Sequence, residues 1–125
     1  MRKIVFSLPL LLGSATLFWL SSQPDLTPPD LGFNFQDKLY HAAAYFVYGA
    51  SALLFVMMWY PTSSTTVWRI SAWTVSVLFA FSDELHQYYV PTRHASVGDW
   101  IADVIGASLS LFLVLHFRKY FFKVR

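Results

Sequence analysis

The sequence predicts an all-α membrane protein, a bundle of four transmembrane helices forming a single domain over residues 1–125. The chain of 125 residues is 56% hydrophobic and only 13% charged, and it contains no cysteine that could build a disulfide framework. Its apolar residues fall in four long stretches, each close to the roughly 20 residues that cross the hydrocarbon core of a bilayer. These stretches, and therefore the predicted helices, are residues 4–20, 38–60, 67–89 and 97–117.

The first stretch follows Met1-Arg2-Lys3, which is also how a secretory signal peptide begins. A small-x-small cleavage site near Ser21–Ser22 is poor, and the apolar run is long for a signal peptide. We therefore predict a retained first helix, with a cleaved peptide as the alternative.

Prolines mark the links between the other stretches. The loop over residues 21–37 contains three prolines, which deny regular helix, and Pro61 opens a short polar turn. Val90 precedes Pro91, and a residue before proline disfavours the helical conformation, so the third helix should end there.

The basic residues are distributed unevenly between the two ends of these helices. With the N-terminus in the cytoplasm, the cytoplasmic side holds Arg2, Lys3, Arg69, Arg118, Lys119, Lys123 and Arg125. The opposite side holds Lys38, Arg93 and all the acids: Asp25, Asp30, Asp37, Asp83, Glu84, Asp99 and Asp103. This excess of bases predicts an orientation with both termini in the cytoplasm and the acids outside it.

Polar and small residues recur at spacings of three and four on three of the helices, which places them on one helical face. On the fourth helix they are Ser96, Asp99, Asp103, Gly106 and Ser110. On the third they are Trp73, Ser76, Ala80, Asp83 and Gln87, and on the second Asp37, His41, Tyr45, Tyr48 and Ala52. We expect these faces to turn inward around a polar cavity open to the outside, with Gly106 and Ser110 allowing close approach of a neighbouring helix.

Several acids have a structural interpretation as well as a functional one. Asp99 completes a Ser96-x-x-Asp99 capping box, and Asp37 suits the first turn of a helix. Asp83 and Glu84 instead lie near a helix C-terminus inside an apolar span, where charge needs compensation. The candidate partners are Lys38, His41, His86 and Arg93, in an inter-helix ion pair or in a functional site.

Other site chemistries are less well supported by the sequence. Glu84, His86, Asp99, Asp103 and His41 are acceptable ligands for a hard divalent cation, but the chain has no His-x-x-x-His or Glu-x-x-His spacing. No cofactor is evident from the sequence, and a divalent cation at this cluster is the less favoured alternative. No nucleophile elbow or phosphate-binding glycine loop is present, and the short basic C-terminal tail suits a membrane surface rather than nucleic acid.

Two segments together resemble the VanZ-like family of small integral membrane proteins. The first is Asp37-Lys38-x-x-His41, and the second runs from Asp83-Glu84-Leu85-His86-Gln87 through Arg93 to Asp99-Trp100-Ile101-Ala102-Asp103-x-x-Gly106. The resemblance covers the second to fourth helices. It implies a bacterial cytoplasmic-membrane protein and a link to resistance against the glycopeptide teicoplanin. Many members carry Asn where this chain has Asp103.

These observations lead to three functional hypotheses. The first is a membrane enzyme that acts on a lipid-linked or amphiphilic substrate, such as a cell-wall precursor, at the outer leaflet. The second is a non-catalytic protein that binds such a lipid, a glycopeptide or an envelope partner. Such a protein would give immunity or serve as a structural partner. The third is a proton-linked transporter, but the cytoplasmic halves of the helices carry no ionisable relay that could conduct protons. The candidate catalytic residues are Glu84, Asp103, Asp99 and His41, with Glu84 or Asp103 as general base. The candidate substrate-binding residues are Arg93, Lys38, Gln87 and Asp83, and membrane lipids and further copies of the chain are the other expected partners.

Overall fold

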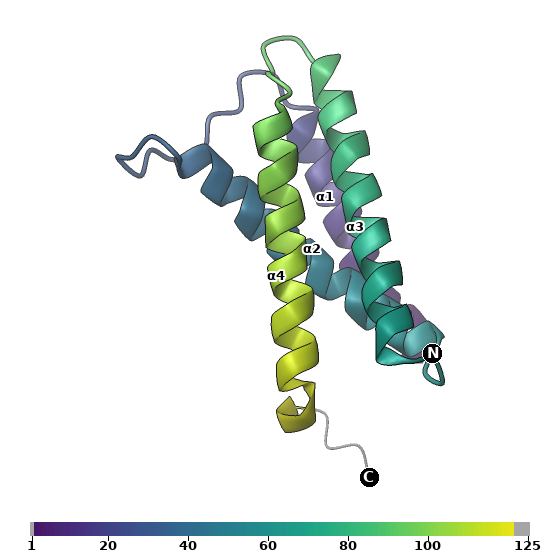
Figure 1. Cartoon of the computed structure of the whole chain (residues 1–125). Coiled ribbons are helices and arrows are strands. Elements are labelled where there is room, and N and C mark those ends of the chain that lie inside the picture. Colours follow the sequence, from purple (N-terminus) through teal and green to yellow (C-terminus); the bar gives the residue numbers. More distant parts are fainter. Residues whose placement is uncertain (1, 122–125) are drawn as a thin grey trace.

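Four α-helices follow one another along residues 2–121, the part of the chain that the computed structural model describes (Figure 1). They are α1 (Arg2–Ser21), α2 (Gln36–Trp59), α3 (Thr65–Tyr88) and α4 (Val97–Phe121). The four predicted helices are confirmed. α1, α2 and α3 begin two residues earlier than predicted because their polar first residues belong to the helix but not to the apolar stretch. Two bases of the predicted cytoplasmic set, Lys123 and Arg125, lie outside the described residues.

Local side-chain chemistry explains where these helices begin and end. The Ser64 hydroxyl accepts a hydrogen bond from the Val67 amide at 3.3 Å, which caps the start of α3. α3 ends at Tyr88, just before the Val90–Pro91 step, as predicted. At the start of α4 the Ser96 hydroxyl accepts from the Asp99 amide at 3.0 Å and donates to Asp99 Oδ2 at 2.7 Å. The N-cap half of the predicted capping box is therefore present, whereas the Ser96 amide donates to Glu84 rather than to Asp99.

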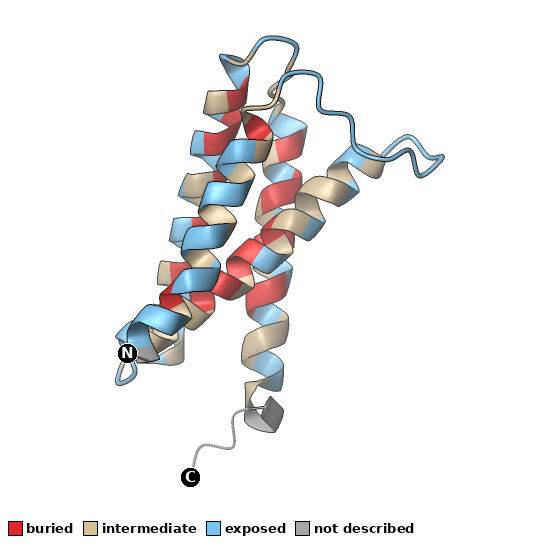
Figure 2. Ribbon diagram, turned by 180° about the vertical axis from the view of Figure 1, so that it is seen from behind, coloured by how far each residue is buried: buried red, intermediate tan, exposed pale blue. Residues whose placement is uncertain are grey.

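The helices are not all aligned. α1, α3 and α4 run side by side along the molecule, whereas α2 crosses them obliquely, so that its first turns lean away from the bundle (Figures 1 and 2). The burial pattern agrees, because the buried residues of α2 begin only at Tyr45. The first turns of α2 line two cavities together with the loops that precede α2 and α4.

Small residues allow α2 and α4 to cross at close range. A Cβ atom placed on Gly49 of α2 would lie 2.9 Å from the Ala107 Cα and 2.6 Å from the Ser110 hydroxyl of α4. Gly106 of α4 meets the backbone of Ala42 in the same way. The small residues predicted on α4 therefore do bring two helix backbones together.

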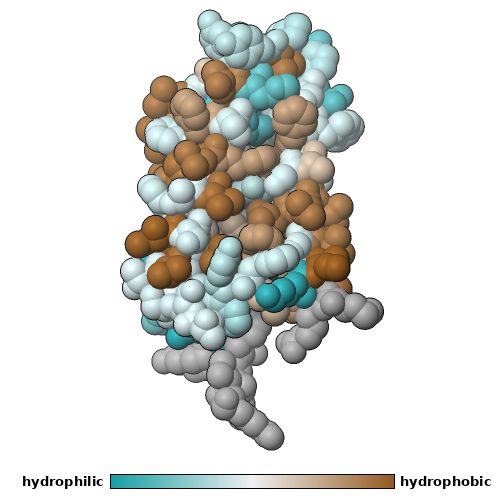
Figure 3. Space-filling view, turned by 90° about the vertical axis from the view of Figure 1, so that its right-hand side faces the viewer, coloured by the Kyte–Doolittle hydropathy of each residue, from teal (hydrophilic) through white to brown (hydrophobic). Residues whose placement is uncertain are grey.

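Burial and hydropathy fit a membrane environment. The buried apolar core consists of Ala52, Leu53, Val56, Ala72 and Leu111, with a second group of Tyr45, Tyr48 and Ala80 nearer the polar end. Large apolar side chains on all four helices are exposed, and Figure 3 shows such side chains along one face. By length and composition, three helical segments could cross a membrane: Lys3–Ser21, Gln36–Trp59 and Val97–Arg118. α3 does not meet the same criterion, so the composition supports three of the four predicted spans.

Candidate functional site

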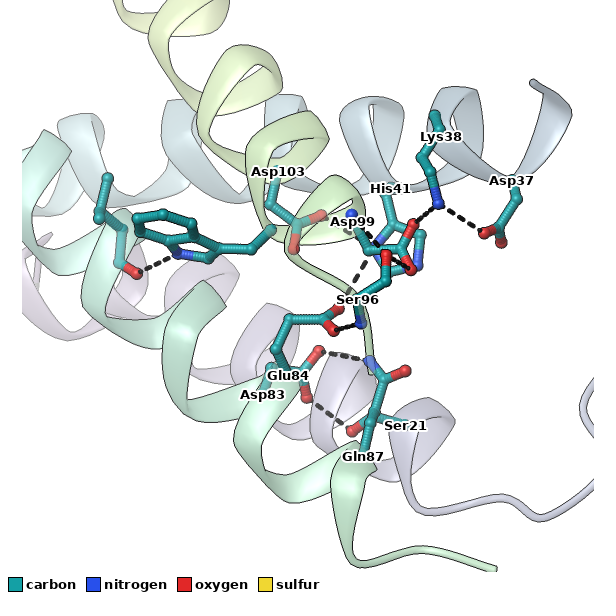
Figure 4. A network of polar contacts seen from close by, with 12 residues as sticks. Ser21, Asp37, Lys38, His41, Asp83, Glu84, Gln87, Ser96, Asp99 and Asp103 are labelled. Atoms are coloured by element: carbon teal, nitrogen blue, oxygen red, sulfur yellow. Dashed lines mark hydrogen bonds and ion pairs between the residues drawn. The ribbon is translucent and has the colours of Figure 1, made fainter. Parts of the chain in front are cut away.

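Polar side chains from all four helices converge near the end of the bundle that carries the loops between α1 and α2 and between α3 and α4 (Figure 4). The predicted inward faces of α2, α3 and α4 do meet there, although two predicted members of those faces, Asp37 and Trp73, are exposed. The converging residues are Ser21, Lys38, His41, Asp83, Glu84, Gln87, Ser96, Asp99 and Asp103. They form three connected groups.

The deepest group joins α2, α3 and α4 through His41. Its Nδ1 atom lies 3.0 Å from Asp103 Oδ1 and 3.9 Å from Glu84 Oε1. The side chain of Asp103 is only 1% exposed and that of Glu84 9%. The other oxygen of Glu84 accepts a hydrogen bond from the Ser96 amide at 3.0 Å, which fixes the carboxylate against the start of α4.

The second group links α2 to the start of α4. The Lys38 ammonium forms an ion pair with Asp99 Oδ1 and lies 3.3 Å from Asp37 Oδ2. Asp99 Oδ2 accepts from the Ser96 hydroxyl as part of the capping interaction. Asp99 thus begins a helix and binds the neighbouring helix at the same time.

The third group joins α1, α3 and the loop after α3. Asp83 Oδ1 accepts from the Ser21 hydroxyl at 2.6 Å, and the Gln87 amide lies 3.5 Å from Asp83 Oδ2. Gln87 Oε1 in turn accepts from Arg93 Nη2 at 3.1 Å, while Arg93 Nη1 donates to the Leu26 carbonyl at 3.2 Å. Arg93 therefore connects the two loops that lie above the site.

Several buried polar atoms at this end have no hydrogen-bond partner among the residues that the structure describes. They are Glu84 Oε1, Asp103 Oδ2, Arg93 Nε and the Tyr45 hydroxyl oxygen. Buried polar atoms are nearly always paired, so a group of unpaired atoms in one place needs an explanation, such as a water, an ion or a ligand.

Two of the cavities that adjoin these groups lie next to each other. One, of about 330 Å³, is lined mainly by polar residues of the loops and helix ends, among them Asp37, His41, Gln87, Arg93 and Asp99. The other, of about 400 Å³, has a largely apolar wall that includes Leu17, Leu20, Pro28, Pro29 and Ala44. Six residues line both cavities: Leu26, Thr27, Asp37, His41, Gln87 and Arg93. The cavities therefore share a mainly polar boundary.

Comparison with known protein families shows to which family the chain belongs. Residues 2–118 match the model of the VanZ/LLP1 family. The chain belongs to the VanZ/LLP1 family. The match confirms the resemblance predicted from the second to fourth helices and extends it to α1. No curated protein and no solved structure matches the chain significantly.

In this VanZ/LLP1 protein the partners of several residues differ from those considered from the sequence. Lys38 pairs with Asp99 and Asp37 rather than with Asp83 or Glu84. His86 lies 2.8 Å from the Ser22 hydroxyl and stacks on Phe18. Of the four candidate partners for Asp83 and Glu84, only His41 comes within ion-pair distance of either acid among residues 2–121. Helical periodicity predicts on which face of its helix a residue lies. It does not predict how far along a neighbouring helix that residue is placed, and this position determines its partner.

The VanZ/LLP1 site also contains residues that the sequence patterns do not predict. In the sequence, Ser21 and Ser22 stand out only as a poor cleavage position, yet both bind polar residues of α3. Thr92 was not singled out, although its hydroxyl accepts from the Asp25 amide at 2.9 Å and ties the two loops together. The two adjacent serines at the end of an apolar helix could have indicated this role, because a membrane anchor that contacts only lipid does not need polar side chains there.

Proposed function

We propose that this VanZ/LLP1 protein is an integral membrane protein that binds an amphiphile with an anionic head group on its extracytoplasmic side. The observation that carries the proposal is the pair of cavities, one polar and one largely apolar, with Arg93 and His41 on their common boundary. An amphiphile places a charged group and a hydrocarbon chain side by side, which such a pair of cavities fits.

Arg93 is the residue best placed to select the head group. Its guanidinium donates to the neutral oxygens of Gln87 and Leu26, and no carboxylate lies within ion-pair distance of it in the described part of the chain. Its Nε atom is buried and has no hydrogen-bond partner among residues 2–121. A guanidinium forms strong, directional hydrogen bonds with phosphate and carboxylate oxygens, so an anionic group would satisfy it.

We infer the side of the membrane on which the site lies from the number of membrane spans and the distribution of charge. α3 has 24 residues and would be about 36 Å long at 1.5 Å per residue. It runs alongside α1 and α4 (Figure 1), so we propose that it is the fourth span even though its composition is less apolar. The charge distribution supports cytoplasmic termini in a bacterial cytoplasmic membrane and a site on the opposite side.

The class of amphiphile follows from that placement. Lipid-linked cell-wall precursors carry phosphate groups and are presented at the outer leaflet, and an amphiphilic glycopeptide such as teicoplanin would approach the same surface. Binding of either would connect the protein to the cell envelope and to glycopeptide resistance.

Catalysis on the bound head group is the second candidate function. Asp103 orients His41 through a 3.0 Å hydrogen bond, and His41 lines both cavities. A histidine held by a carboxylate is a common general base. Lipid profiling of a deletion strain separates the two functions, because catalysis changes a lipid species and binding alone leaves the lipid composition unchanged.

The binding proposal can be tested in lipid nanodiscs by native mass spectrometry. We expect a polyprenyl monophosphate to bind the protein and the matched polyprenol, which lacks the phosphate, to bind at least tenfold more weakly. The Arg93→Gln variant should lose at least tenfold in affinity for the phosphate lipid, whereas Arg69→Gln, which removes an equal charge at the other end of α3, should not. Equal binding of the two lipids, or equal losses in the two variants, would contradict the proposal.

A further inference from the structure

Three metal-ligating side chains from three different helices face one another at the deepest point of the site. They are His41 of α2, Glu84 of α3 and Asp103 of α4, and one ligand atom from each lies within 4.8 Å of the others. We propose that these residues bind one divalent transition-metal ion. The proposal does not depend on amphiphile binding.

The spacing of the donor atoms suits a common ion. Two ligands bound at about 2.1 Å to one ion lie roughly 3.0–3.4 Å apart in octahedral or tetrahedral geometry. His41 Nδ1 is 3.0 Å from Asp103 Oδ1 and 3.9 Å from Glu84 Oε1. The Glu84 carboxylate would have to move by about 0.5–0.9 Å toward His41 to bring the longer distance into this range.

The unpaired oxygens are an independent indication that something is bound here. Glu84 Oε1 and Asp103 Oδ2 are buried and have no hydrogen-bond partner within the described residues. Both carboxylates are at least nine-tenths buried and face His41 (Figure 4). A metal ion between these side chains would satisfy Glu84 Oε1, and it would satisfy Asp103 Oδ2 as well where Asp103 binds through both oxygens.

The charges around the group also favour a cation. Two carboxylates lie beside one imidazole, and neither has a lysine or arginine within 4.0 Å in the described chain. The nearby Lys38 is already paired with Asp99 and Asp37. Two buried carboxylates without a cation are strongly unfavourable at membrane depth, and a divalent ion would neutralise them.

The donor set and its surroundings indicate the kind of ion. One imidazole with two carboxylates suits Zn²⁺, Mn²⁺ or Fe²⁺ better than Mg²⁺ or Ca²⁺, which prefer oxygen ligands alone. The Ser96 amide holds the second oxygen of Glu84, as a supporting group does in metal sites. Three protein ligands leave a coordination position open, and His41 borders both cavities from which water or a ligand could enter.

The experiment measures uptake of Zn²⁺ and Mn²⁺ alone by the full chain in nanodiscs, by isothermal titration and elemental analysis after removal of free metal. We expect one ion per chain. Glu84→Gln, which keeps an oxygen for the Ser96 amide, and Asp103→Asn should each weaken binding at least tenfold. Added Zn²⁺ should also raise the melting temperature of the wild-type protein but not that of Glu84→Gln.

Two acids nearby provide matched controls. Asp83→Asn removes a buried carboxylate of the same helix end, and Asp37→Asn removes an exposed acid that pairs with Lys38. Both variants should bind metal as the wild type does. If the wild-type protein binds no stoichiometric metal, the group is an imidazolium ion pair and the proposal is wrong, whatever the variants do. Equal losses in Asp83→Asn and Glu84→Gln would overturn it as well.

Discussion

Gly106 of α4 lies directly against the backbone of Ala42 of α2, so that a Cβ atom on Gly106 would come within 2.9 Å of the Ala42 Cα. Asp103 lies one helical turn before Gly106, and His41 is the neighbour of Ala42. The close approach of the two backbones therefore sets the distance at which His41 and Asp103 meet.

Replacement of Gly106 by alanine should destabilise the protein and disturb the site. The added methyl group meets backbone atoms, which cannot rotate away, and overpacking of this kind costs about 1–3 kcal/mol. Unfolding in mixed micelles measures the change. Gly13→Ala is the matched control, because its new Cβ would lie at an ordinary 3.5 Å from the Tyr48 ring; that variant should be neutral or slightly more stable. Similar losses at both positions would contradict the backbone argument.

The ion pair between Lys38 and Asp99 should couple α2 to α4. Lys38→Met leaves the buried carboxylate without its cation, and we expect a loss of about 1–3 kcal/mol, between the values for exposed and for fully buried pairs. Asp99→Asn keeps an oxygen for the capping interaction with Ser96. The double variant should therefore be more stable than the sum of the two single losses predicts. A double-mutant cycle measures this coupling, and strictly additive losses would show that the pair contributes nothing.

The hydroxyl of Ser21 should stabilise the buried carboxylate of Asp83. In Ser21→Ala, Asp83 keeps only the longer contact with Gln87, so unfolding free energy should fall by about 1–3 kcal/mol. Ser82→Ala serves as control, since that hydroxyl is exposed and donates only to the Phe79 carbonyl of its own helix. Thermal unfolding in nanodiscs compares the two, and an equal effect would contradict a special role for Ser21.

The proposed topology can be tested directly because the chain has no cysteine of its own. We expect a membrane-impermeant maleimide to label His94→Cys in intact spheroplasts and to label Thr62→Cys only after the membrane is opened. These exposed positions flank the two ends of α3. A cysteine in place of the buried Ser76 should remain unlabelled in both cases. Labelling of both loops from the same side would show that α3 does not span the membrane.

Much of the fold follows from the sequence, because hydropathy and proline positions mark helices regardless of how they pack. The inward faces can also be predicted from the sequence, since the positions of His41 along α2 and of Asp99 and Asp103 along α4 fix the face of each helix on which they lie. The pairing could not be predicted in the same way. The choice of Asp99 rather than Glu84 as the partner of Lys38 depends on how far α2 tilts across α4. That tilt is set where Gly49 and Gly106 allow the backbones to touch.

Ser21 has a further consequence for how the protein is made. It is the last residue of α1 and also the donor to Asp83, while Leu17 and Leu20 form part of the apolar cavity wall. The segment that resembles an export signal thus contributes to the site in the folded chain. Cleavage after α1 would remove part of the cavity wall and a hydrogen-bond donor together. We therefore predict that the segment is retained after it has directed the chain into the membrane.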